Sequence, residues 1–340
     1  MNSDELNAPF TESEAETLLN MIRSFGDLNE KDLSSGSYRA GYAEGGVLKH
    51  GVQKDMIAFR DLLRSRLGRQ MMGANEGDTG PILMQPVGGM DKIISGFLNN
   101  VGEQVNYRAM VTSVQVTDKG VNVAYDQDGV RHSLEVDYCF NCIPTHLMVG
   151  IDHNFPSDYV KAMKYVRRGE AYKAAFQAKR RFWEDLDIYG GISWSNTKSR
   201  QLWYPTHGIH KAKGVLLSAY DYGGGMYHTM MSQDERIEAH LADHEKIHPD
   251  FRELVEKPVT IGWHRMNHML GCSARWSRNL GRGWTHEEET LYHTLQAPVN
   301  GRHYFIGDQI SMHSAWQESA VMSAKWALSH MDAHVRAELA

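Results

Sequence analysis

Residues 304–331 read YFIGDQISMHSAWQESAVMSAKWALSHM: an apolar strand, a Gly-Asp pair, a short polar loop and a long helix rich in alanine and serine. Asp308 stands at the end of the strand. The helix, expected to begin near Trp316, points free N–H groups and a partial positive charge toward the same spot. The carboxylate suits ribityl or ribose hydroxyls, and the helix suits a flavin that gains negative charge on reduction. The alternative is an acid that only caps the helix.

The composition is that of an ordinary globular protein, with 41% hydrophobic and 23% charged residues among 340. A formal net charge of −6 gives no basic field for nucleic acid or an anionic membrane. No segment approaches the ~20 apolar residues that span a bilayer, and MNSDELNAPF has no signal-peptide pattern. The three cysteines fit a reducing compartment. We expect a cytoplasmic protein that binds neither nucleic acid nor membrane.

Hydrophobic periodicity predicts a mixture of helices and strands, hence an α/β (α+β) fold class. A Gly/Ser loop at 34–46 separates two expected helices, and the polar cluster NEGDTGP at 75–81 is the best domain boundary. Helices are expected at 12–33, 52–68, 91–102 and 233–247, three or four strands within 105–144, and further strands at 173–183 and 214–222.

Two constellations suggest metal or redox chemistry, and both have simpler explanations. Cys139 and Cys142 have CxxC spacing but lie in an apolar strand, where packing is the more natural role. His240, His244 and His248 recur at four-residue spacing on one helix face, but acidic neighbours favour a solvated face over a metal site. We therefore expect no metal. No GxGxxG and no P-loop occurs among the 340 residues.

The stretch YFIGDQIS…AWQESAVMSA resembles the C-terminal flavin-binding signature of the flavin-dependent amine oxidase family, especially its L-amino-acid oxidase branch. Further motifs agree in order over most of residues 80–330: MQPVGGMDKI, VTSVQV, VDYCFNCIP, KAAFQAKRRFWEDLDIYGG, SRQLWYP, LLSAYDYG and GWHRMNHMLGCSARW. The resemblance implies part of an FAD-binding two-domain fold, with a mixed-sheet substrate domain. The expected division is a helical segment at 1–80, FAD-binding parts at 81–165 and 263–340, and a substrate-binding domain at 166–262.

The resemblance also implies how FAD is held. Val111 matches the position whose backbone contacts the adenine, and Asp308 matches the acid that binds ribityl hydroxyls. Trp316 and Gln317 match the helix entrance that meets the isoalloxazine ring. Cys272 falls where some mitochondrial amine oxidases attach flavin covalently, although amino-acid oxidases generally do not, and simple packing beside the ring is the alternative.

Four residues match catalytic positions of the family. Lys173 matches the lysine that holds a water at flavin N5, and Trp263 the tryptophan beside the ring. Tyr220 matches the tyrosine that contacts the substrate carboxylate, and Trp316 would form one wall of a cage around the amine.

Two positions depart from the family pattern. The second cage wall is often an aromatic residue directly after Cys272, but Ser273 stands there, and Trp276 is the candidate to compensate. Ala315 replaces a usual glycine before Trp316 and should crowd that loop.

The implied activity is FAD-dependent oxidation of an L-amino acid by hydride transfer, giving an imine and then a keto acid, ammonia and hydrogen peroxide, with oxygen as the acceptor. The alternatives are a monoamine or polyamine oxidase, an amino-acid monooxygenase and a non-catalytic structural subunit. The sequence does not name the substrate side chain.

The family's GxGxxG unit and its carboxylate-binding arginine have no match in these residues. Two phosphate charges need a tight glycine turn that opens a helix. We therefore expect a second polypeptide that carries this FAD-binding half, with a truncated gene product as the alternative. Without that half, strands within 108–150 and at 304–306 should expose a broad apolar surface.

Overall fold

The computed structural model describes residues 9–26, 42–43, 52–55, 60–61, 64, 85–209, 211–222, 225–276, 285–311 and 314–339. The chain divides into two compact units, Met1–Pro81 and Ile82–Ala340, which are considered separately. The four-part division expected from sequence stays a prediction. None of the helices in the described ranges is long and apolar enough to cross a bilayer.

The first unit contains α2 (Glu12–Gly26) and a small antiparallel pair, β1 (Tyr42–Ala43) with β2 (Val52–Gln53). Thr11 and Glu14 form a reciprocal cap on α2, with Thr11 N–H donating to Glu14 Oε2 over 2.8 Å. The helix expected over 52–68 is wrong at its start, because residues 52–53 pair as a strand, and part of the 34–46 loop is the strand β1. Residues 54–55 lie in neither a helix nor a strand, and residues 60, 61 and 64 are helical. The rest of both segments, like 27–33, lies outside the described residues.

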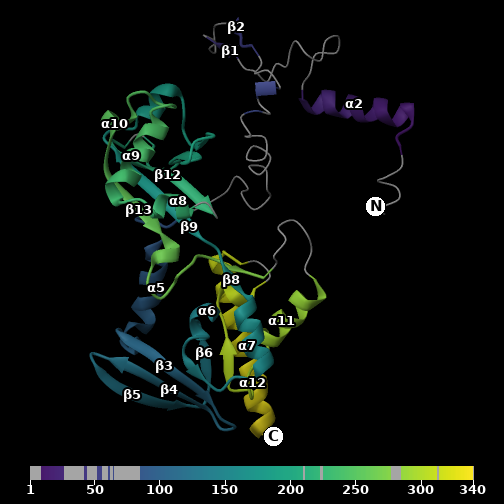
Figure 1. The fold of residues 1–340 in the computed structure, drawn as a ribbon, viewed down its shortest axis with the longest axis vertical. Coiled ribbons are helices and arrows are strands. Elements are labelled where there is room, and N and C mark those ends of the chain that lie inside the picture. Colours follow the sequence, from purple (N-terminus) through teal and green to yellow (C-terminus); the bar gives the residue numbers. More distant parts are fainter. Residues whose placement is uncertain are drawn as a thin grey trace. The chain divides into compact units, whose positions relative to one another are not determined.

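The second unit begins with α5 (Asp91–Val101), the short 3-10 helix η3 (Gly102–Gln104) and a four-stranded sheet (Figure 1). The sheet order is β5-β4-β3-β7, in which β7 runs parallel to β3 and the other pairs are antiparallel. Its strands are β3 (Ala109–Val116), β4 (Val121–Gln127), β5 (Val130–Val136) and β7 (Asp152–His153). The helix at 91–102 and the strands within 105–144 are therefore confirmed.

Strands β6 (Cys139–Asn141) and β15 (His303–Phe305) form a parallel pair inside the main hydrophobic core. Helices surround the pair: α6 (Thr145–Met148), α7 (Ser157–Tyr165), α11 (His286–Gln296) and α12 (Gln317–Leu339). Tyr304 and Phe305 are 1% and 0% exposed, so the prediction of an exposed apolar surface at 304–306 is wrong for these two residues. The rings of Phe155, before α7, and Tyr159, in α7, pack against Phe305. Within 108–150 the expected apolar exposure is found at some residues and not at others, since Leu134 is exposed and Val114 is buried.

The other sheet has five antiparallel strands in the order β10-β11-β12-β9-β13. They are β9 (Ala171–Ala178), β10 (Gly191–Trp194), β11 (Gln201–Tyr204), β12 (Gly214–Tyr222) and β13 (Val255–Gly262). Three helices contact its strands: α8 (Gly225–Thr229), α9 (Gln233–His244) and α10 (Phe251–Leu254). Along β9, Tyr172, Ala174 and Phe176 are buried, whereas Lys173 and Ala175 lie on the more open face.

The strand expected at 173–183 ends early. β9 stops at Ala178, and residues 182–186 form the 3-10 helix η4 (Phe182–Leu186). Phe182 and Trp183 are both buried in one core cluster. Two consecutive side chains cannot enter the same core from a strand, because a strand directs them to opposite faces, and this favours the helical turn.

The histidines of α9 are buried, so the expected solvated face is wrong. His240 Nε2 lies 2.9 Å from Tyr172 Oη, and His240 Nδ1 lies 2.8 Å from Ser199 Oγ. His244 Nε2 donates to the Ser218 carbonyl over 2.6 Å. Burial lowers the pKa of His240 to about 3 and that of His244 to about 4. In the ranges that the structure describes, no group of His, Cys, Asp or Glu is arranged to hold a metal ion.

Four short elements outside the two large sheets contain residues of the candidate site. They are β8 (Arg167–Arg168), β14 (Ala274–Arg275) and the 3-10 helices η5 (Trp263–Arg265) and η6 (Asp308–Ile310). β14 pairs antiparallel with β8, which sets Ala274 opposite Arg168 and Arg275 opposite Arg167.

Candidate functional site

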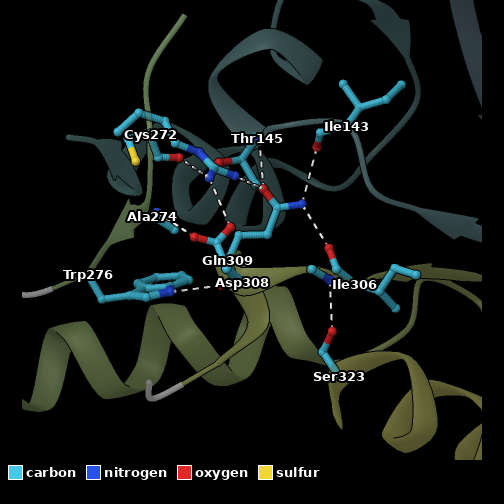
Figure 2. A network of polar contacts seen from close by, with 11 residues as sticks. Ile143, Thr145, Cys272, Ala274, Trp276, Ile306, Asp308, Gln309 and Ser323 are labelled. Atoms are coloured by element: carbon cyan, nitrogen blue, oxygen red, sulfur yellow. Dashed lines mark hydrogen bonds and ion pairs between the residues drawn. The ribbon is translucent and has the colours of Figure 1, made fainter. Parts of the chain in front are cut away.

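Arg168 joins three segments that are far apart in the sequence (Figure 2). Its Nη1 donates to Asp308 Oδ1 over 2.9 Å and to the Cys272 carbonyl over 3.1 Å, and its Nη2 donates to Gln309 Oε1 over 2.9 Å. The side chain is only 9% exposed. A charged fork with this many partners fixes the relative positions of β8, η6 and the segment that enters β14.

Asp308 is held from both sides. Its Oδ2 accepts the Ala274 N–H over 2.8 Å, while its Oδ1 takes Arg168. The preceding Gly307 has φ +101°, a left-handed conformation that favours glycine. The Gly307 N–H donates to Ser323 Oγ of α12 over 2.8 Å, so the turn after β15 is tied to the C-terminal helix.

Gln309 forms the buried side of the same network. Its Oε1 also accepts the Thr145 N–H over 3.0 Å, and its Nε2 donates to the carbonyls of Ile143 and Ile306. Its backbone carbonyl accepts from Trp276 Nε1 over 2.9 Å. Every polar group of this amide therefore has a partner, as burial of an amide requires.

Sequence reasoning missed Arg168 and Gln309. The only signals were the Arg-Arg-Gly run at 167–169, just before the strand of Lys173, and the position of Gln309 directly after Asp308.

Lys173 and Tyr220 are brought together by strand register. They face each other across β9 and β12, with Ile261 of β13 on the other side of Lys173. Lys173 Nζ lies 4.6 Å from the centroid of the Tyr220 ring. The Trp203 ring meets Tyr220 edge-on with centroids 6.0 Å apart, so an aromatic wall adjoins the ammonium group.

Tyr222 connects this pair to the Arg168 network. Its hydroxyl hydrogen-bonds to that of Tyr220, and the Cys272 thiol also hydrogen-bonds to it. Burial, followed by the contact with Tyr220, raises the pKa of Tyr222 well above its ordinary value, so its hydroxyl stays protonated at neutral pH. A continuous chain of contacts thus runs from Lys173 to Cys272.

Trp263 lies at the end of β13 and is half-buried. Its carbonyl accepts the Gly271 N–H over 3.2 Å, which ties it to the residue before Cys272. Cys272 N–H in turn donates to the Gly169 carbonyl over 2.8 Å. Trp263 and Cys272 therefore border the same small region.

Trp316, 47% exposed, and Gln317 lie at the start of α12, where the helix was expected to begin. No described contact joins either side chain to Lys173 or Asp308. Val111 sits in β3 beside a bulge and packs on the main core. β3 pairs with β7 only at Ser113 and Val114. The backbone edge of Val111 on the β7 side therefore has no strand partner among the described residues.

The structure shows where Trp276 and the two departing positions, Ser273 and Ala315, lie. Trp276 is 3% exposed and stacks on Tyr165, so it cannot be the second wall of an amine cage, and this suggestion is wrong. Ser273 is buried as well, at 6% exposure. Ala315 has φ +78°, the conformation in which the usual glycine would be unstrained.

Comparison with known proteins identifies the family. A sequence model of flavin-containing amine oxidoreductases matches residues 9–327. The chain belongs to this family. FAD is the cofactor of this family, and the mixed α/β fold expected above is confirmed.

Curated relatives include the flavin-dependent L-tryptophan oxidase RebO of Lentzea aerocolonigenes, 27% identical over 75% of this chain and 54% of that protein. The L-amino-acid oxidase of Echis ocellatus is 24% identical over 70% of this chain and 47% of that protein. The chain thus spans about half the length of the curated relatives it matches.

Solved structures agree in fold. A cyclohexylamine oxidase from Brevibacterium oxydans IH-35A superposes with a TM-score of 0.62 at 14% identity, covering 73% of this chain and 53% of that one. A putrescine oxidase mutant redesigned in cofactor binding gives a TM-score of 0.61 at 19% identity, over 72% and 53%.

The residues around Asp308 fit a polyhydroxyl chain of the kind FAD contains. Nothing lies within 4 Å of the point where a Cβ of Gly307 would stand, so the backbone there is open to close approach. The Asp308 side chain is 20% exposed, and a carboxylate accepts about four hydrogen bonds, of which two are used. Arg168 Nε and Thr145 Oγ1 are buried without a partner in the described residues. A ribityl chain would find both acceptor and donor groups here.

Proposed function

We propose that this chain serves in an FAD-dependent L-amino-acid oxidase. The enzyme would oxidise the α-amine to an imine, which water hydrolyses to a keto acid and ammonia, while oxygen becomes hydrogen peroxide. The observation that carries the proposal is that the Lys173 ammonium group lies over the Tyr220 ring, which is connected through Tyr222 to Cys272. The L-amino-acid oxidases among the relatives support the same choice.

When bound, FAD supplies the hydride acceptor at N5, and the protein orients the substrate and excludes solvent. Lys173 would hold a water by donating from its ammonium group. Tyr220 would donate its hydroxyl to the substrate carboxylate, a contact that separates amino acids from simple amines.

The tryptophans would act on solvent and geometry. Trp263 and Trp316 would exclude bulk water and align the Cα–H bond of the substrate. Asp308 would accept ribityl hydroxyls, and the first N–H groups of α12, at Gln317, would face the pyrimidine edge. Val111 would present its unpaired backbone edge to the adenine, and Cys272 would pack beside the ring.

The pyrophosphate of FAD still needs a glycine turn of the GxGxxG type, and the 340 residues contain no GxGxxG. Our proposal is that a second polypeptide supplies it together with the GxGxxG unit. Affinity purification of the tagged chain from cells that express the neighbouring reading frames tests this. Isolation of the 340-residue chain alone as a flavin-loaded, active protein would refute it.

Product analysis tests the activity. Purified protein with FAD should convert an L-amino acid with a large apolar side chain into its keto acid with stoichiometric hydrogen peroxide. An amide with carbon dioxide would instead indicate a monooxygenase, and faster oxidation of the decarboxylated amine would indicate an amine oxidase. A protein that binds no flavin with its partner present would be a structural subunit.

A further inference from the structure

The Trp263 side chain is placed by the backbone around it. Its indole forms neither a hydrogen bond nor a ring contact with any residue that the structure describes. The Trp263 carbonyl accepts the N–H groups of Met266 and Gly271, each over 3.2 Å. The direction of the indole therefore depends on the backbone on either side of it, at Gly262 and His264.

Thr229, at the end of α8, contacts the residue on each side of Trp263. Its Oγ1 lies 2.9 Å from His264 Nε2 and donates to the Met226 carbonyl over 3.2 Å. A hydroxyl has one proton, so the imidazole N–H is the donor in the first of these contacts. A Cβ on Gly262 would stand 2.5 Å from Thr229 Cγ2, so the threonine methyl packs directly on the glycine backbone. One buried side chain thus holds Gly262 through its methyl and His264 through its hydroxyl.

His228 anchors α8 to the five-stranded sheet. The side chain is 0% exposed, and its ring stacks on Tyr172 with centroids 4.8 Å apart and on His240 with centroids 4.6 Å apart. Tyr172 is also the register partner of Gly262 between β9 and β13. Because α8 cannot shift along the sheet without losing both ring contacts, Thr229 is kept against Gly262.

We propose that Thr229 and His264 are positioning residues for Trp263, which together fix the direction in which its indole faces the candidate site. This rests on the proposed function, in which Trp263 excludes water and aligns the Cα–H bond of the substrate. Thr229 and His264 act through the backbone of Gly262 and Trp263, without touching substrate or flavin. A displacement of about 1 Å in a group that aligns the reacting atoms can cost about a hundredfold in rate.

The first experiment needs neither flavin nor turnover. The full chain, with any copurifying subunit, is labelled with fluorotryptophan, and the fluorine NMR resonance of Trp263 is assigned by its absence in Trp263→Phe. Thr229→Val replaces the hydroxyl with a methyl and should shift or broaden that resonance, whereas Thr229→Ser keeps the hydroxyl and should change it far less. Thr290→Val is the control, because its exposed hydroxyl donates to the His286 carbonyl within α11 and its loss should leave the resonance unchanged.

A compensating pair tests the methyl contact and covers the case that Thr229→Val does not fold. Gly262→Ala would place its Cβ 2.5 Å from Thr229 Cγ2 and should displace the Trp263 resonance, while the next nearest atom, His264 Cε1, lies at an ordinary 3.5 Å. Thr229→Ser removes the crowded methyl, so the double variant should recover the wild-type resonance. A double variant as displaced as Gly262→Ala overturns the contact.

The second experiment measures flavin reduction by an L-amino acid in stopped flow, with FAD and any copurifying subunit present. Thr229→Val should slow reduction at least about tenfold and change the apparent substrate Kd less than about twofold, because it misplaces Trp263 and does not touch the substrate. In a Trp263→Phe background the same substitution should have little further effect, since the group that it positions is gone.

The outcomes separate the positioning proposal from the proposed function. An unchanged Trp263 resonance in Thr229→Val, or equal changes in Thr229→Val and Thr229→Ser, overturns the positioning role. A slowing as large in the Trp263→Phe background as in the wild type overturns it too. If the wild type oxidises no amino acid but the Trp263 resonance responds to Thr229 as described, the oxidase function fails and the positioning of Trp263 stands.

Discussion

Replacing Arg168 with methionine tests the network that organises the candidate site. The change removes the guanidinium but keeps most of the side-chain volume, so Asp308 retains only Ala274 N–H and Gln309 Oε1 retains only Thr145 N–H. Removing one partner of a buried pair typically costs 3–5 kcal/mol. The Asp308 side chain is one-fifth exposed, so water compensates in part and we expect a loss of about 3 kcal/mol.

Urea denaturation followed by tryptophan fluorescence measures the effect, since Trp276 is buried beside Gln309. A double-mutant cycle with Asp308→Asn should give a coupling energy of about 2 kcal/mol. Arg336→Met is the control, because its pair with Asp332 lies on the surface of α12 and the free energy of unfolding should not change measurably. A loss below about 1 kcal/mol for Arg168→Met, or no coupling, would refute the reasoning.

Three further predictions follow from single residues. Lys173→Met should slow flavin reduction or reoxidation at least about tenfold with flavin still bound, and unchanged stopped-flow rates in both half-reactions would exclude its role. Ala315→Gly should raise the free energy of unfolding by roughly 0.5–1 kcal/mol, because it relieves the positive φ, and a lower urea midpoint would contradict this. The pKa values of His240 and His244 in the folded protein are about 3 and about 4, below the ordinary 6.5. As the pH falls below 6.5, the unfolded chain therefore binds protons that the folded protein does not. The free energy of unfolding falls by about 1.4 kcal/mol per pH unit for each of these histidines. His240→Gln should lower the slope between pH 6 and pH 4.5 by about 1.4 kcal/mol per pH unit, measured by urea unfolding. His293→Gln at an exposed site should leave the slope unchanged, and equal slopes in wild type and His240→Gln would disprove the assignment.

Local patterns were sufficient for much of the architecture. The alternation within 105–144 and 214–222 predicted strands that the structure contains, because side chains on a strand change face at every residue whatever their partners. The strand, glycine, acid and helix at 304–331 likewise follow from chemistry within a few residues. Sequence alone also placed Lys173 and Tyr220 on strands, but not against each other.

Only the tertiary structure decided which distant groups meet. Arg168 and Asp308 are 140 residues apart, and no periodicity links them. The burial of His240 could not be predicted either, since a helix face with acidic neighbours looks solvated until a sheet supplies Tyr172 and Ser199 as partners. The two kinds of knowledge differ because backbone geometry repeats over two or four residues, whereas pairing and burial depend on which surfaces the whole chain brings together.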